Sequence, residues 1–272
     1  QVLAFVCIYI LTKTTQGSLS ALAFAFSAIP CLFLLIVSII VYQTKSYKDV
    51  APSLYGIRFS LTRSIVGLGG QFFVIMVSML FVFQFVNIIL SRLQGPEAVT
   101  QYNITYKYFN VLNMIVNIVL NPFWSAFTDA YIKKDYDWMR SVLNKLEKMW
   151  LLCIPVLLLM LVSSNFLYKL WIGDSVIISF SLSVCMAIYV LCQTGGNIYM
   201  YLINGTSKVR LQLIVYLLFA LISLPLIEYC CKYCGIEGVL IVPAVAFVLQ
   251  ACIGRIQILK MINGTAKGIW LK

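Results

Sequence analysis

Polar side chains recur at helical spacing within the apolar stretch 103–127, and they are the first candidates for chemistry in this chain. Five of them share one edge of the predicted helix, namely Asn103, Lys107, Asn110, Asn117 and Asn121, with Asn113 at its margin. At about 100° per residue, the five lie within roughly 80° of arc. A Lys facing lipid would cost about 2.5–3.5 kcal/mol, so this amide edge is predicted to face other helices or a watery cavity. Cavity lining is favoured, and hydrogen bonding between helices is the alternative.

Two further groups of polar residues could join the amide edge. Gln193 and Asn197 are spaced by four in the apolar stretch 177–201, so they share one helix face. Arg58 and Arg63 come just before the apolar stretch 65–90. The forked donors of Arg suit phosphate groups. Both arginines could instead mark a membrane boundary, because long cationic side chains reach from an apolar helix end into the headgroups.

The composition is that of a membrane protein. Apolar residues make up 62% of the 272 residues and charged residues 11%, against about 45–50% and about 25% in soluble domains. A soluble fold would need far more polar surface. Long apolar stretches predict transmembrane helices, and they cover 19–42, 65–90, 103–127, 149–168, 177–201, 211–228 and 238–259. The predicted fold class is all-α, a polytopic membrane helix bundle.

The polar breaks between these stretches alternate in charge. Most of the 20 Lys and Arg fall in every second break, as the positive-inside rule predicts for cytoplasmic loops. This assignment puts the C-terminus in the cytoplasm. The net charge of +11 does not indicate nucleic-acid binding, because the basic residues are scattered among the breaks and form no single basic face.

Two breaks are long enough to hold elements of their own. Residues 43–64 are predicted to be a cytoplasmic linker with a short surface helix. Residues 129–148 are predicted to form an amphipathic helix at the membrane interface, because apolar and basic residues fall on different faces. Residues 261–272 are expected to be a cytoplasmic tail. The chain starts with Gln1 inside an apolar run, so it is interpreted as the C-terminal piece of a longer protein.

Enzyme and metal signatures are missing from the sequence. There is no His, only nine Asp and Glu, and no phosphate-binding or nucleophile motif, so no enzyme activity and no cofactor are predicted. Cys230, Cys231 and Cys234 form a cluster in a predicted short loop. Without His or a second Cys pair, zinc binding is not predicted. Free cysteines are expected, and a disulfide is the alternative if this loop faces an oxidising compartment.

Four short motifs carry a resemblance to a known family. Residues 95–103 read GPEAVTQYN and fit a G-x-x-x-V-x-x-Y pattern, and residues 121–130 read NPFWSAFTDA and fit P-x-W-x-A-x-x-[DE]-A. Residues 170–173 (LWIG) and 204–206 (NGT) fit further recurring positions. The chain thereby resembles polysaccharide flippases that export O-antigen or capsule repeat units (Wzx-like), in the MATE-type exporter superfamily. The motifs cover about 90–210, and the rest of the chain is similar by its span pattern.

The resemblance implies a MATE-like fold with two six-helix lobes around a central cavity and alternating access. Residues 1–42 would be the last transmembrane helices of a truncated N-terminal lobe, and residues 65–260 the C-terminal six-helix lobe. The implied activity moves an undecaprenyl-pyrophosphate-linked oligosaccharide across the bacterial inner membrane, with a proton or sodium ion as coupling ion. Lys107, Arg63 and Arg58 would face the pyrophosphate, and the Asn and Gln amides would bind sugar hydroxyls.

Two other functions remain open. The first is a cation-coupled multidrug exporter of the same superfamily. Such exporters usually need a carboxylate inside the membrane, and the sequence predicts none there. The second is a membrane glycan polymerase or acyltransferase, which the absence of His and of a large outer loop disfavours. A missing N-terminal region could hold either feature.

Overall fold

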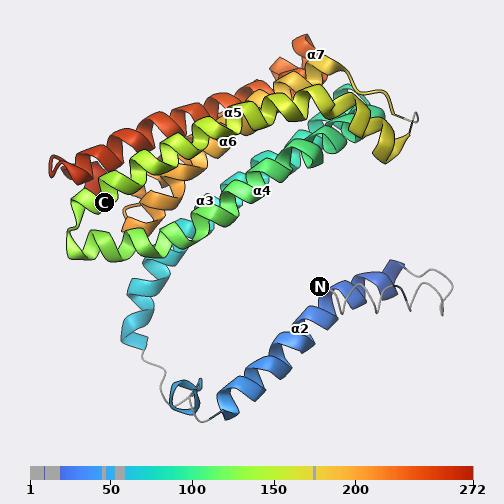
Figure 1. Cartoon of the computed structure of the whole chain (residues 1–272). Coiled ribbons are helices and arrows are strands. Elements are labelled where there is room, and N and C mark those ends of the chain that lie inside the picture. The colour runs from blue at the N-terminus through green and yellow to red at the C-terminus, as the bar shows by residue number, and fades with distance from the viewer. Residues whose placement is uncertain (1–8, 10–18, 45–46, 53–58, 174–175, 272) are drawn as a thin grey trace. The chain divides into compact units, whose positions relative to one another are not determined.

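The computed structural model describes residues 9, 19–44, 47–52, 59–173 and 176–271. Within these residues the chain forms helices and short turns and contains no strand, so the predicted all-α class is confirmed. The chain divides into two compact units, Gln1–Thr62 and Arg63–Lys272. The boundary lies inside helix α3 (Phe59–Leu93), which begins in cyan in Figure 1.

The described part of the first unit is mainly one apolar helix. α2 (Leu19–Gln43) matches the predicted stretch 19–42, and a short 3₁₀ helix, η1 (Lys48–Val50), follows it. The short surface helix expected in the linker is therefore a single turn. The linker also ends earlier than residue 64, because α3 already begins at Phe59. No Gly or Pro interrupts residues 59–66, so the helix of the next apolar stretch extends back over them.

Five helices that are long and apolar enough to cross a membrane make up most of the second unit (Figure 1). They are α3, α4 (Pro96–Lys133), α5 (Tyr136–Ile172), α6 (Phe180–Thr206) and α7 (Arg210–Ile262). In α3 the membrane-spanning candidate is Val66–Leu93. A hydrocarbon core about 30 Å thick needs about 20 mostly apolar residues, which each of the five provides. The chain is therefore a multi-pass membrane protein.

The helices extend beyond the apolar stretches that predicted them. α4 starts at Pro96, with Gly95 as its N-cap, so residues 96–102 are helical and do not form part of a break. Pro suits this position because the first helical N–H groups have no partner within the helix. Hydropathy marks only the part of a helix that lies in lipid, whereas capping decides where the helix begins and ends.

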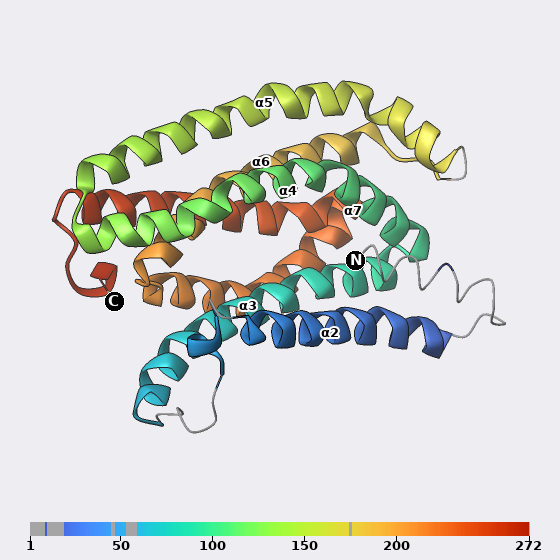
Figure 2. The ribbon, with the colours of Figure 1, turned by 60° about the horizontal axis from the view of Figure 1, so that its bottom comes forward.

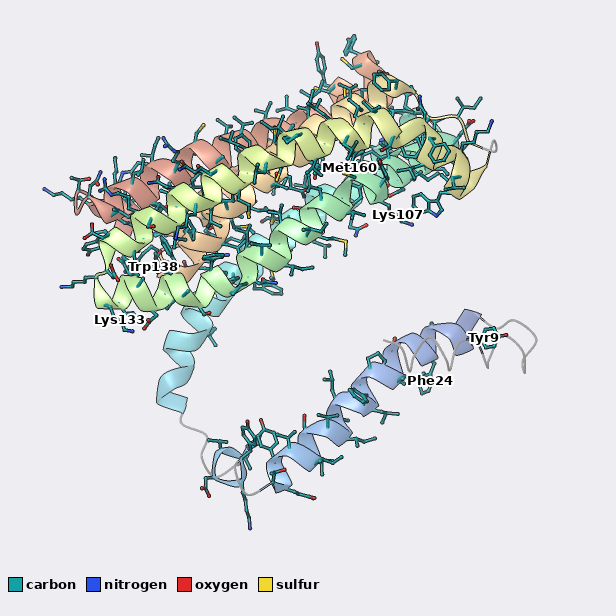
Figure 3. The ribbon with its side chains drawn as sticks, in the orientation of Figure 1. Tyr9, Phe24, Lys107, Lys133, Trp138 and Met160 are labelled. Atoms are coloured by element: carbon teal, nitrogen blue, oxygen red, sulfur yellow. The ribbon has the colours of Figure 1, made fainter. Side chains whose placement is uncertain are left out.

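The prediction of a separate amphipathic helix at residues 129–148 is wrong. Lys134 has a left-handed backbone, with φ of 59°, and it ends α4. Asp135 then caps α5 by accepting a hydrogen bond from the Trp138 backbone N–H at 3.1 Å. Figure 3 shows Lys133 and Trp138 on either side of this turn. The basic and apolar residues of the segment are thus shared between the end of α4 and the start of α5.

Helix α7 consists of two arms that run side by side in opposite directions, drawn in orange and red in Figure 2. Gly235 separates arm 210–234 from arm 236–262, because its backbone (φ 67°, ψ −147°) is not helical. A Cβ added to Gly238 would lie 2.1 Å from the Cys230 carbonyl oxygen, so only Gly fits there. The predicted stretches 211–228 and 238–259 correspond to these arms.

The sequence predicted that Cys230, Cys231 and Cys234 lie in a loop, and this prediction is wrong. All three residues belong to the helical arm that precedes Gly235, because a single non-helical residue is enough to reverse the chain. Each is a free thiol in the structure. Cys231 is buried, and Cys234 is exposed.

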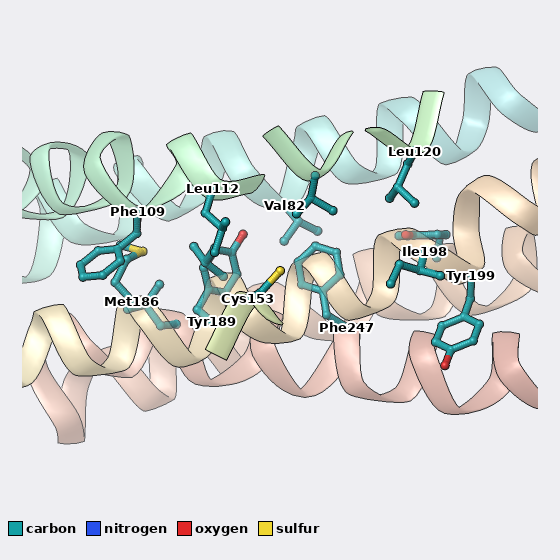
Figure 4. Close-up of a cluster of buried hydrophobic side chains, with 14 of the residues drawn as sticks. Val82, Phe109, Leu112, Leu120, Cys153, Met186, Tyr189, Ile198, Tyr199 and Phe247 are labelled. Carbon is teal, nitrogen blue, oxygen red and sulfur yellow. The ribbon is translucent and has the colours of Figure 1, made fainter. Parts of the chain in front are cut away.

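Helix α6 lies at the centre of the second unit. In the most apolar 18-residue stretch of α6, 67% of the residues are buried, against 17% in the corresponding stretch of α5. Two glycines of α6 let its neighbours approach closely. A Cβ added to Gly195 would lie 3.0 Å from Trp150 of α5, and a Cβ added to Gly196 would lie 3.1 Å from Phe247 of α7. Figure 4 shows the core beside it, where Phe109 and Leu112 of α4 lie close to Met186 and Tyr189 of α6. Phe109, Met186 and Tyr189 are almost completely buried.

Candidate functional site

The amide edge of α4 runs along the border between the buried and the exposed face of the helix. Lys107 and Asn121 are exposed, and Asn103, Asn110 and Asn117 are half-buried. Figure 3 shows Lys107 at the surface of α4. Apolar side chains continue on the exposed side, where Met114 is 58% exposed. A cation and a row of amides therefore meet an apolar surface along one line of this helix.

Behind the amide edge, side-chain amides connect α4 to α6. Asn197 Nδ2 donates hydrogen bonds to Asn113 Oδ1 at 3.0 Å and to Asn117 Oδ1 at 3.2 Å. Asn113 Nδ2 donates in turn to Asn110 Oδ1 at 3.0 Å. Asn113 and Asn197 are each 6% exposed. We call these four residues the amide cluster, and in it the geometry is that of hydrogen bonding between helices, the alternative that the sequence left open.

At the other end of the edge, Asn103 connects α4 to α3. Its Nδ2 donates to Asn87 Oδ1 at 3.0 Å and to the Val99 carbonyl at 2.8 Å. Asn103 and Asn87 are both half-buried. The amide edge thus contacts α3 near one end and α6 in its middle, and Lys107 lies between these two contacts in the chain.

Buried oxygen atoms without a partner continue the polar face of α6. Gln193 lies one turn before Asn197 and is 7% exposed. Its Oε1 has no hydrogen-bond partner in the described part of the chain, and the same holds for the hydroxyl of Tyr189, which is 1% exposed. An unpartnered buried acceptor costs about 1–3 kcal/mol. The face of α6 that meets α4 therefore keeps unused hydrogen-bonding capacity next to the amide cluster.

The side chains of the two arginines proposed for phosphate binding lie outside the part of the chain that the structure describes. Arg58 lies outside the residues that the structure describes. Arg63 belongs to α3 and is the first residue of the second unit, but its side chain is also outside the described set. Their relation to Lys107 therefore stays a prediction.

An ion pair that sequence reasoning missed joins α5, α6 and α7. Arg255 Nε lies 2.9 Å from Glu147 Oε1, and the Tyr199 hydroxyl donates to the same oxygen at 2.8 Å. The Glu147 side chain is 26% exposed and that of Arg255 53%. The partners of Glu147 follow it by 52 and 108 residues, so no local spacing in the sequence could have indicated the group.

Two of the four motifs contact each other. The Thr128 hydroxyl donates to the Gly205 carbonyl at 2.7 Å, and a Cβ added to Gly205 would lie 2.7 Å from the Trp124 carbonyl oxygen. Residues 121–130 and 204–206 therefore hold the ends of α4 and α6 together. The motif at 170–173 ends α5, with Gly173 at φ 74° as its C-cap. These positions have structural reasons to be small or capping residues.

An apolar cleft of about 520 Å³ opens between α3 and the two arms of α7. Val82, Val242 and Phe247 are buried within it, and Leu218 and Val245 at its rim are more than half exposed. Its polar lining residues, Tyr216 and Gln250, hydrogen bond to each other, and Gln250 Nε2 donates to the Gly196 carbonyl at 3.0 Å. The cleft therefore suits hydrocarbon and offers little to a polar ligand.

No group of three or more His, Cys, Asp or Glu within the described residues could hold a metal ion.

Comparisons with models of protein families, with curated proteins and with solved structures find no match to this chain. The chain's own residues therefore establish an all-helical, multi-pass membrane protein whose central feature is an amide cluster between α4 and α6, beside an exposed Lys107.

Proposed function

We propose that this chain is part of a flippase that moves an undecaprenyl-pyrophosphate-linked oligosaccharide across the bacterial inner membrane by alternating access. In this proposal the second unit belongs to the C-terminal lobe of a MATE-like transporter. Lys107 and the amides beside it form the surface that the polar part of the substrate contacts. The motifs at 95–103, 121–130, 170–173 and 204–206 support the choice of family.

The observation that carries the proposal is an exposed cation within a candidate membrane span, flanked by amides. Lys107 belongs to α4, between Asn103 and Asn110, and is exposed on the surface of the second unit. At a lipid-facing position it would cost about 2.5–3.5 kcal/mol. That cost is avoided if another part of the transporter and a water-filled path cover this edge. An ammonium group there attracts a pyrophosphate, and exposed or half-buried amides bind sugar hydroxyls.

The apolar cleft and the exposed apolar sides of the helices suit the lipid part of such a substrate. Transport of a lipid-linked glycan requires that only the polar head cross the membrane, while the hydrocarbon chain stays among lipid tails. The surface beside Lys107 has this character, because exposed Met114 and Ile118 lie on the same helix about two and three turns further along. A polar line bordered by apolar surface is what a head-and-tail substrate needs.

The test is replacement of Lys107 in the complete transporter. We expect Lys107→Ala to lower surface glycan export roughly tenfold or more, because a hydrogen bond to a charged group contributes about 1.5–3 kcal/mol. Lys107→Arg keeps the charge and should retain most of the export. Lys133→Ala is the matched control on the same helix, since Lys133 is exposed and paired with Asp129 at 2.7 Å. Normal export by Lys107→Ala at wild-type protein level contradicts the proposal.

The ion pair between Glu147 and Arg255 favours one alternative function, a cation-coupled multidrug exporter. Such a transporter would use a carboxylate within its helices, and Glu147 is a carboxylate that contacts both α6 and α7. A Glu147→Gln variant separates the two functions. A drug exporter should lose cation-dependent efflux in this variant. A glycan flippase that does not use Glu147 should keep exporting glycan.

A further inference from the structure

The residues that follow α7 turn back and attach to the end of the bundle. We call residues 263–271 the end segment, which closes with the 3₁₀ helix η3 (Gly268–Leu271). Gln257 Nε2 donates to the Trp270 carbonyl at 3.3 Å. Lys260 Nζ lies 4.0 Å from the centre of the Trp270 ring, a cation–π contact. The end segment therefore has a fixed position relative to α7.

The depth of the end segment in a membrane follows from the length of the second arm of α7. The arm 236–262 is about 40 Å long at about 1.5 Å per residue. A bilayer measures about 30 Å across its hydrocarbon core and about 40–45 Å with its headgroups. With Gly235 at one face, the end of the arm reaches the headgroup layer of the other face. The end segment then lies at the level of the lipid headgroups.

The exposed side chains of the end segment match that layer. Ile269 is 41% exposed and Leu271 38% exposed, and Lys267 is exposed as well. Trp270 is half-buried, and Trp is a residue type that concentrates at membrane–water boundaries. Aliphatic groups for the acyl region, an aromatic ring and an exposed cation thus occur within five residues.

The charges around the segment are mostly positive. From Arg255 onward the sequence contains no Asp or Glu. Arg140 of α5 adds a cation, because its Nη2 donates to Asn263 Oδ1 at 2.6 Å. The acidic residues on that part of α5 are Asp135, which caps the helix, and Asp137. Lys260, Lys267 and Arg140 therefore give the end of the bundle a basic surface around Trp270.

We propose that the end segment is an interfacial anchor that binds the headgroups of anionic lipids in the membrane around the protein. Lys267, Lys260 and Arg140 attract the lipid phosphates, and Ile269 and Leu271 enter the upper acyl region. Charge complementarity selects anionic over zwitterionic lipid, since each Lys or Arg near such a surface strengthens binding about fivefold. This inference does not depend on the proposed transport function.

The test uses the purified chain in liposomes and the fluorescence of Trp270. Lipids with brominated acyl chains quench nearby Trp, and the difference between wild type and Trp270→Phe isolates the signal of Trp270. Brominated phosphatidylglycerol, which is anionic, should quench this signal more strongly than brominated phosphatidylcholine at equal mole fraction. Ile269→Ser, which keeps Trp270, should lower the quenching by both lipids.

Charge variants complete the test. Lys267→Gln should raise the mole fraction of phosphatidylglycerol needed for half-maximal quenching about fivefold. Lys133→Gln is the control, because Lys133 is exposed but already paired with Asp129, and it should leave that mole fraction unchanged. Equal quenching by the two lipids would overturn the proposal. So would an absence of Trp270 quenching, which would mean that the end segment faces protein.

Discussion

At the scale of single residues, the amide cluster is where polar chemistry and packing coincide. Asn197 donates to two oxygens of α4 from a site that is 6% exposed. Asn197→Leu would leave the side-chain oxygens of buried Asn113 and half-buried Asn117 without this donor. We expect the free energy of unfolding to fall by about 1–2 kcal/mol. Unfolding of the detergent-solubilised protein by increasing fractions of dodecyl sulfate measures it.

A matched variant shows whether this loss comes from the hydrogen bonds. Asn144 is exposed on α5, so Asn144→Leu makes the same chemical change without removing a buried contact. It should alter the unfolding free energy by less than about 0.5 kcal/mol. Equal effects of the two variants would mean that the amide cluster adds nothing to the stability of the α4–α6 contact.

Spacing in the sequence predicted which residues share an edge, but it could not predict their partners. Helical periodicity placed Asn110, Asn117 and Lys107 together on α4, and Gln193 with Asn197 on α6. Whether such an edge meets water or another helix depends on which helix packs against it. That is decided by glycines and side-chain shapes far away in the chain. The Glu147, Tyr199 and Arg255 group escaped prediction for the same reason.

At the scale of elements, the reversal of α7 depends on a close backbone contact. A Cβ on Gly238 would lie 2.1 Å from the Cys230 carbonyl oxygen, a distance that real Cβ contacts essentially never show. Gly238→Ala must therefore push the two arms apart, and we expect a loss of about 1–3 kcal/mol of stability. Thermal unfolding of the purified protein, followed by circular dichroism, measures the change.

Gly70 of α3 provides the control for this variant. An added Cβ there would meet no atom within 4 Å, and Ala favours helix over Gly by about 1 kcal/mol. Gly70→Ala should leave the melting temperature unchanged or raise it. If Gly238→Ala behaves in the same way, then the arms are less closely packed than the structure has them.

Hydropathy located the helices well, because burial in lipid demands long apolar runs. It failed at their ends, where single residues decide. Lys134 adopts a left-handed backbone and Asp135 caps the next helix, which divides a segment that had been predicted as one amphipathic helix. Gly235 likewise turns the chain within one residue. A cap such as Asp135 is readable in the sequence, whereas a left-handed Lys is not.

At the scale of the whole molecule, the order of the helices predicts which turns share a side of the membrane. Successive spans alternate in direction, so Lys134, Ser207 and Gly264 should lie on one side, and Gln94 and Ile177 on the other. The basic breaks predict that the first group is cytoplasmic. Single cysteines at these sites in a cysteine-free background test this. A membrane-impermeant maleimide should label positions 94 and 177 in intact cells.

The same labelling identifies an incorrect topology. Positions 134, 207 and 264 should react only after the cells are permeabilised. Labelling of 134 and 94 from the same side would contradict a membrane crossing by α4. Labelling of all five positions in the opposite sense would reverse the predicted orientation without changing the order of the spans.

The glycine contacts of α6 have a mechanical consequence. A Cβ added at Gly195, Gly196 or Gly205 would come within 3.1 Å of Trp150 of α5, Phe247 of α7 or Trp124 of α4, respectively. A helix held at such short range on three sides cannot slide or rotate alone, because closely packed interiors do not deform gradually. We therefore expect α4 to α7 to move together as one rigid body, with flexing confined to segments outside them.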